Sequence, residues 1–264
     1  MGKIFYFTQL FFCRQKVRRE IFKIILLILT PVFLSAQDHT GSFEFTPMAG
    51  VPETVKILIF VLSFIGFGSK AGVFPFHVWL PHAHPAAPSH ISAVMSGVMI
   101  KTGIYGIIRM YVLLDWHTAM FGHLVLIAGM ISGILGVVYA LGQHDIKRLL
   151  AYHSVENIGI ILIGIGLGMV GVAAGNPVMA LLGFGGGLLH VLNHAIFKSL
   201  LFMGAGMVLH KTGTRTIDVL GGLIKKMPIS FISFMIGIIA LSGVPPLTGF
   251  GGKWLLYEAL IERG

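Results

Sequence analysis

Four lysines of this sequence lie inside long apolar segments of the kind that cross a lipid bilayer. A lysine at the centre of a bilayer costs about 2.5–3.5 kcal/mol on insertion scales, so it needs a partner, water or a function. Ionisable residues in membrane segments most often mark paths for ions or protons. We therefore predict a proton or cation path that includes Lys70, Lys101, Lys198 and Lys253.

A row of titratable side chains adds to this prediction. His190, His194 and Lys198 are spaced four residues apart, which places them on one face of a helix with about 6 Å of rise between neighbours. A neutral imidazole donates at one nitrogen and accepts at the other, so such a row can relay protons through intervening water. Polar residues that only hydrogen-bond to neighbouring helices would show the same spacing. Three titratable groups that end in a lysine favour the relay.

Glu156 is a carboxylate near the start of an apolar segment, with His153 and Asn157 close to it in sequence. Two interpretations are open. Glu156 either pairs with a lysine of this chain, which would make it part of the path, or caps the helix that follows Asp145. We include Glu156 among the predicted path residues.

A stretch rich in histidine and proline follows Lys70. Its histidines suggest a metal site, but zinc ligands usually form tight pairs on defined turns, and prolines dominate this turn. We predict instead a loop that orders the cytoplasmic mouth of the path, with histidines as local hydrogen-bond partners. The histidines are His77, His82, His84 and His90, and the prolines are Pro81, Pro85 and Pro88.

Motifs for catalysis and for cofactors are missing from the sequence. It has no phosphate-binding loop, no paired catalytic carboxylates and no nucleophile elbow. Its single cysteine, Cys13, does not supply the thiolates of an iron–sulfur cluster. We predict no cofactor, no metal and no catalytic centre in this chain, so any redox chemistry of an assembly would lie in other subunits.

The composition indicates an integral membrane protein. Of 264 residues, 55% are hydrophobic and 11% are charged, against about 25% charged in soluble domains. The net charge of +9 does not indicate nucleic-acid binding, because the basic residues form no stripe with aromatic residues. We predict an all-α, polytopic bundle of transmembrane helices. Its six spans lie near residues 55–79, 91–114, 119–142, 148–171, 178–208 and 228–260.

Two of these spans should be discontinuous helices. Glycine and proline interrupt the first span at residues 68–75 and the last at residues 243–252. Proline removes an amide and clashes with the preceding turn. Such breaks are tolerated at membrane depth only where the backbone is buried in protein or lines a wet cavity. A pair of interrupted helices is the sequence sign of inverted-repeat transporters.

The loops predict the orientation in the membrane. The positive-inside rule assigns the side that is richer in lysine and arginine to the cytoplasm. That side holds Lys147, Arg148, Lys211, Arg215, Lys225 and Lys226.

The first part of the chain, residues 1–54, differs from residues 55–264, which we predict to form the transmembrane domain. Four basic residues precede the apolar run 21–36, which is the order of a signal peptide. The run can also be a short additional span or an artefactual start of a truncated chain. We favour the last two together.

The motifs resemble those of the antiporter-like membrane subunits of NADH:quinone oxidoreductase, Mrp-type cation/proton antiporters and group 4 membrane-bound hydrogenases. The resemblance covers about residues 40–264. Within the family, the chain is most similar to the formate hydrogenlyase and hydrogenase-4 type, and the stretches that distinguish this type are HSVENIGI at 153–160 and residues 69–90. Other matching stretches are MIKTGIYG at 99–106, HDIKRLLAY at 144–152, LNHAIFKSLLF at 192–202, LGGL at 220–223 and GVPPLTGFGGKW at 243–254.

The resemblance implies roles for single residues. Lys70 matches the lysine of the first broken helix, and Lys101 matches the central lysine of the next one. His190, His194 and Lys198 match the central relay, and Lys253 matches the charged residue of the second broken helix. Family members have about fourteen spans in two inverted repeats. This chain is therefore expected to be incomplete at both ends and to lack the glutamate that pairs with Lys70.

The resemblance implies a proton-translocating subunit of a redox-driven complex in a bacterial or archaeal cytoplasmic membrane. Its partners would be other membrane and hydrophilic subunits of a hydrogenase or a complex I-like assembly. The alternatives are a subunit of an Mrp-type cation/proton antiporter and a non-transporting, truncated scaffold fragment. The sequence leaves open whether the ion is a proton or sodium.

Overall fold

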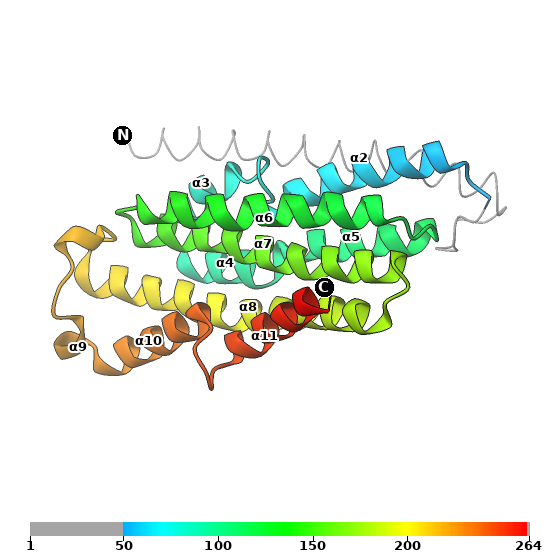
Figure 1. The fold of residues 1–264 in the computed structure, drawn as a ribbon. Coiled ribbons are helices and arrows are strands. Elements are labelled where there is room, and N and C mark those ends of the chain that lie inside the picture. Colours follow the sequence, from blue (N-terminus) through cyan, green and yellow to red (C-terminus); the bar gives the residue numbers. More distant parts are fainter. Residues whose placement is uncertain (1–49, 263–264) are drawn as a thin grey trace, which may run out of the picture. The chain divides into compact units, whose positions relative to one another are not determined.

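The computed structural model describes residues 50–262, and all elements of regular structure in that range are helical. The predicted all-α fold is confirmed there, whereas the run 21–36 and Cys13 lie outside the described residues. The helices are α2 Glu53–Ala71, α3 Trp79–Ala86, α4 Ser89–Val94, α5 Lys101–Leu114, α6 Ala119–Leu141, α7 Ile146–Ala173, α8 Pro177–Thr212, α9 Leu223–Lys226, α10 Pro228–Ser242 and α11 Thr248–Ile261, with a π-helical segment η1 Met95–Met99 and a 3₁₀ turn η2 Ile217–Val219 (Figure 1).

Within residues 50–262, five stretches are long and apolar enough to cross a membrane: α2, the continuous segment Ser89–Leu114, α6, α7 and α8. The sixth predicted span, 228–260, is divided into α10 and α11, of 15 and 14 residues. At 1.5 Å per residue each half is about 22 Å long, which is shorter than the hydrocarbon core of about 30 Å. The sixth span is therefore two half-helices.

Both predicted helix breaks are present. The chain is not helical between Ala71 and Trp79, and again between Ser242 and Thr248. Each break begins with a glycine in the left-handed region: Gly72 has φ +84° and Gly243 has φ +79°. Glycine adopts this conformation without a steric cost and commonly ends helices in this way.

The predicted proline-rich loop is wrong, because most of residues 79–94 is helical, in α3 and α4. Pro81 is the third residue of α3, where an amide has no partner within the helix, and Pro88 is the N-cap residue of α4. His77 and His84 are buried, and their rings stack on Phe74 at 5.1 Å and on Phe202 at 4.4 Å respectively. These two histidines are packed between elements of the fold.

The chain forms two compact units, and the larger one comprises residues 71–104 and 117–264. In its described part α7 packs between α6 and α8, while α4, α10 and α11 pack against α8 (Figure 1). Glycines let the backbones come close: a Cβ on Gly183 of α8 would lie 2.4 Å from the amide nitrogen of Gly168 of α7. Small residues at such contacts are typical of membrane helices. The polar residues of α7 and α8 are thereby held close together.

The smaller unit comprises residues 1–70 and 105–116. Within its described part, the ring of Phe67 in α2 lies against Gly106 of α5, where an added Cβ would be 2.4 Å from Cδ1 of that ring. Lys70 belongs to this unit and lies half-buried in the last turn of α2.

Candidate functional site

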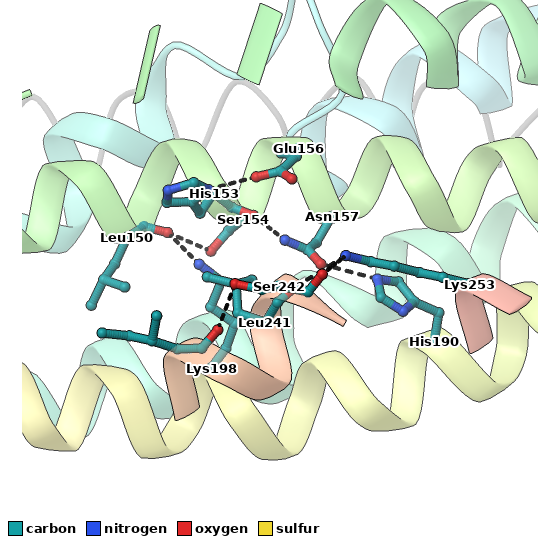
Figure 2. Close-up of polar contacts among 11 residues, drawn as sticks. Leu150, His153, Ser154, Glu156, Asn157, His190, Lys198, Leu241, Ser242 and Lys253 are labelled. Atoms are coloured by element: carbon teal, nitrogen blue, oxygen red, sulfur yellow. Dashed lines mark hydrogen bonds and ion pairs between the residues drawn. The ribbon is translucent and has the colours of Figure 1, made fainter. Parts of the chain in front are cut away.

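The predicted row on α8 lies inside the helix bundle. His190, His194 and Lys198 are each 0% exposed, so all three face the interior. The ammonium Nζ of Lys198 donates to the carbonyl oxygen of Leu150 in α7 at 2.8 Å (Figure 2). A buried lysine needs such an acceptor, because an unpaired buried charge is very costly.

Lys101 is also buried, at the point where a π-helical segment passes into α5. In this segment the amide of Ile100 donates to the carbonyl of Met95, five residues back. The Nζ of Lys101 donates to the carbonyl oxygen of Ser96. Single π-helical turns are rare and occur frequently at functional sites. The sequence did not predict this segment.

Two serines connect the surroundings of Lys101 and Lys198. The hydroxyls of Ser96 and Ser154 are 3.0 Å apart, and Ser154 Oγ donates to the carbonyl of Leu150 at 3.1 Å. That carbonyl is the acceptor used by Lys198. Because Ser154 donates its only hydrogen to Leu150, Ser96 is the donor in the serine pair. The two buried lysines are thus joined through two hydroxyls and two backbone carbonyls.

Asn157 connects α7 to the other end of the histidine row. Its Nδ2 donates to the carbonyl of His153 at 2.7 Å, and its Oδ1 accepts from Nε2 of His190 at 3.0 Å (Figure 2). This bond places a proton on Nε2 of His190. Sequence reasoning did not assign Ser96, Ser154 or Asn157 to the site, although each is a polar residue in an apolar helix.

Glu156 does not cap its helix, because the side chain of Asp145 accepts from the first amides of α7, at 2.8 Å from Lys147 and 3.1 Å from Arg148. Glu156 contacts His153, with Oε2 2.5 Å from Nδ1. Three residues separate the two, so they are neighbours on the helix surface. Of the two interpretations of Glu156, capping is wrong, and its contact partner in the described chain is a histidine.

Lys253 is held at the second helix break. Its Nζ donates to the carbonyls of Leu241 and Ser242 at 3.1 and 3.2 Å, across the break from α11 to the end of α10 (Figure 2). On the other side of the break, Nδ2 of Asn193 donates to the carbonyl of Thr248 at 2.5 Å. The last carbonyls of a helix have no partner within it, so Lys253 caps α10 from outside.

These groups form one electrostatic cluster within the larger unit. The charges of Lys101 and Lys198 both act on His194, and the charge of Lys253 acts on His190. The Glu156 carboxylate acts on Lys198 and Lys253. The structure therefore brings together six of the seven predicted residues, whereas Lys70 lies in the smaller unit.

Three ring nitrogens of this cluster are buried without a hydrogen-bond partner among the described residues. Nδ1 of His190 and both ring nitrogens of His194 are buried and make no hydrogen bond to the described protein groups. The ring of Phe197 lies beside both histidines, with centroids 6.2 and 5.4 Å away. Buried polar atoms of this kind are uncommon and require an explanation.

The fold and this cluster define a class of protein: a multi-pass helical membrane protein with interrupted helices and buried titratable groups between them. Residues 23–264 match the transmembrane family described as NADH:quinone oxidoreductase/Mrp antiporter. The chain belongs to this family, which confirms the resemblance inferred from its motifs.

The chain is similar in sequence to components of a hydrogenase and of formate hydrogenlyase. It is 44% identical over 241 residues to hydrogenase-4 component B of Escherichia coli strain K12, covering 89% of this chain and 36% of that protein. It is 46% identical over 204 residues to formate hydrogenlyase subunit 3 of the same organism, covering 77% and 34%. The structure resembles a chain of the Mrp complex from Dietzia sp. DQ12-45-1b, with a TM-score of 0.78, 27% identity and coverage of 93% and 45%. The chain thus spans about a third of the length of these two curated relatives.

Proposed function

We propose that this chain is a proton-translocating membrane subunit of a redox-driven complex, of the membrane-bound hydrogenase, formate hydrogenlyase or NADH:quinone oxidoreductase-like kind. The observation that carries the proposal is the cluster of titratable side chains around Lys198. In it, Lys198 and Lys101, His190 and His194 of α8, and Lys253 at the helix break lie within electrostatic reach of one another. The identity to hydrogenase-4 component B supports the assignment to redox-driven complexes. Other membrane and hydrophilic subunits would be its partners, in a bacterial or archaeal cytoplasmic membrane.

In this mechanism the chain holds and passes protons but carries out no redox chemistry. Lys198 takes up a proton, and water between the imidazoles of His194 and His190 passes it along α8. A carbonyl such as that of Leu150 cannot pass a proton, so it serves to orient Lys198. A change of charge at one lysine alters the free energy of protonation at its neighbours, because buried charges are poorly screened. Lys101 and Lys253 lie at two edges of the cluster, and Glu156 biases Lys198 and Lys253. We place Lys70 in the same path.

The test is Lys198→Ala in the complete complex, assayed in inverted membrane vesicles. Addition of the electron donor should acidify wild-type vesicles, measured by quenching of a pH-sensitive dye. We expect Lys198→Ala to lower this signal by about a hundredfold or more, as loss of a positioned proton-transfer group does. The exposed Lys225 of α9 provides the matched control, and Lys225→Ala should pump normally. Normal pumping by Lys198→Ala would remove Lys198 from the path.

The alternative is a subunit of an Mrp-type cation/proton antiporter, and the structural likeness to the Mrp complex favours it as the second candidate. The same vesicles distinguish the two. An antiporter exchanges protons when sodium is added to vesicles that hold a pH gradient, without any electron donor. The redox-driven subunit needs the electron donor. A chain that supports neither signal in an assembled complex would be a scaffold.

A further inference from the structure

A cavity lies near the end of α8, lined by none of the proposed path residues. It is open to the outside, its volume is about 480 Å³, and it is bordered by the first turn of α4, the last turns of α8 and the segment that joins α9 to α10. Ser89 of α4 packs so closely on α8 that a Cβ on Gly206 would lie 2.5 Å from the Cβ of Ser89. The lining residues are Ser89, His90, Met203, Gly206, Met207, His210, Lys211, Lys226, Met227 and Ser230.

The lining carries positive charge and no acid. Lys211 and Lys226 are exposed, and His90 and His210 add two further basic side chains. The nearby acids are engaged elsewhere in the described chain: Asp145 lies 3.2 Å from Arg215, and Asp218 lies 2.9 Å from His144. The charge that complements this cavity is therefore negative.

The cavity also has an apolar wall, formed by Met203, Met207 and Met227. Met203 is 47% exposed, and the Sδ of Met207 accepts a hydrogen bond from Oγ of Ser230 at 3.4 Å, which ties α8 to α10. Methionine adapts its shape to irregular apolar ligands. A free inorganic anion would not use such a wall, whereas an amphipathic anion would use both the wall and the lysines.

The position in the membrane agrees with this chemistry. The cavity lies at the end of α8, one of the helices long enough to cross the bilayer. The positive-inside rule assigns this end to the cytoplasmic side, where anionic lipid head groups bind basic pockets between transmembrane helices. We propose that this cavity is a binding site for an anionic phospholipid. Its phosphate lies between Lys211 and Lys226, and its acyl chains run along the methionine wall.

The experiment uses the full chain purified in a neutral detergent, in its complex where one forms. Native mass spectrometry measures binding of three probes: phosphatidylglycerol, phosphatidylcholine and glycerol 3-phosphate. We expect phosphatidylglycerol to bind well above the other two. Each of Lys211→Gln and Lys226→Gln should weaken it about fivefold, the effect of one lysine near an anionic lipid.

Lys225→Gln is the matched control, because Lys225 neighbours Lys226 on α9, is exposed and does not line the cavity. It should bind phosphatidylglycerol within about twofold of the wild type, since its charge lies outside the site. Thermal unfolding of each variant checks that it is folded. Exposed lysines tolerate glutamine, so all three variants should unfold at the wild-type temperature.

Four results would overturn the proposal. Equal binding of phosphatidylcholine would show that charge is not recognised. Equal binding of glycerol 3-phosphate would identify a site for free phosphate. Equal losses in Lys225→Gln and Lys226→Gln would place the lipid elsewhere on the surface. A photocrosslinker in place of Met203 that captures a neighbouring subunit rather than lipid would make this surface a protein interface.

Discussion

At the two helix breaks of the larger unit, backbone amide and carbonyl groups are hydrogen-bonded by different kinds of side chain. At the break before α3, the amide of Phe74 donates to Oγ of Ser132 in α6 at 2.9 Å, and the ring of His77 stacks on Phe74. At the break before α11, the ammonium of Lys253 donates to two carbonyls of α10. One break is held by a hydroxyl and aromatic rings, and the other by a side chain that can lose its proton.

The two hydrogen-bonding groups, a hydroxyl at the first break and an ammonium at the second, respond differently to a change of protonation. A hydroxyl that accepts from an amide keeps the same charge whatever the state of its neighbours. When Lys253 loses a proton, its bonds to the carbonyls of Leu241 and Ser242 weaken, because charge-assisted hydrogen bonds are about twice as strong as neutral ones. Loss of a proton by Lys253 would thus weaken bonds that hold the second break, whereas the hydroxyl of Ser132 at the first break has no charge to lose.

Lys70 and Lys253 each lie beside a helix break, but on opposite sides of it. Lys70 precedes its break, in the last turn of α2, whereas Lys253 follows its break, in the second turn of α11. Lys253 can therefore reach back to the carbonyls that end α10, which is the contact observed. Only this second lysine is positioned to cap the helix that precedes its break.

The largest effect should come from closing the second break sterically. In Gly249→Ala the new Cβ would lie 1.8 Å from the carbonyl oxygen of Ala240, so α10 and α11 must separate. We expect the free energy of unfolding to fall by about 3 kcal/mol or more, the upper part of the range for overpacking. Thermal unfolding in detergent measures it. In the matched variant Gly251→Ala the nearest atom would be 3.8 Å away, and stability should be kept or slightly raised. Equal stability of the two variants would mean that the helices can separate at little cost.

The second prediction tests whether Lys253 must gain and lose a proton for transport to occur. Lys253→Arg retains donors for the carbonyls of Leu241 and Ser242 but holds its proton permanently. We expect normal folding and a loss of redox-driven proton uptake of about a hundredfold. Lys253→Ala should lose proton uptake equally and should also unfold at a lower temperature, because the cap is gone. Normal uptake by Lys253→Arg would show that this lysine is only structural.

The third effect is that of the nearby carboxylate. Glu156→Gln removes a negative charge that acts on Lys198 and Lys253. We expect proton uptake to fall by about tenfold, which corresponds to about 1.4 kcal/mol in one proton-transfer step. Stability should change by less than about 1 kcal/mol, since the contact with His153 is partly exposed. The control is Glu258→Gln, which removes an acid of α11 whose partner is Trp254. A similar loss of uptake in both variants would indicate a general effect of surface charge.

The sequence predicted the long helices, both breaks and the shared face of the α8 row, because each depends on local signals: apolar length, Gly and Pro positions, and a four-residue spacing. It did not predict α3, which lies where a loop was expected. It did not predict the contacts of Ser96, Ser154 and Asn157. Those contacts depend on the distance between helices, which the glycines of α7 and α8 set, and no single segment encodes it. The π-helical turn before Lys101 was missed for a similar reason. Helical spacing cannot reveal one inserted residue.

The smallest effect should be found at the first break. Ser132→Ala removes the acceptor for the amide of Phe74 and leaves that amide without this hydrogen bond, at a cost of about 1–2 kcal/mol in the free energy of unfolding. Proton uptake should stay within about twofold of the wild type, because no titratable group depends on Ser132. Ser154→Ala is the informative comparison: it removes a hydroxyl of the same size, also buried, that lies between Lys101 and Lys198. It should cost similar stability yet lower proton uptake several-fold, because Ser96 loses its acceptor and the water near Lys198 loses an ordering group. If both serine variants pump alike, the pair of Ser96 and Ser154 lies outside the path.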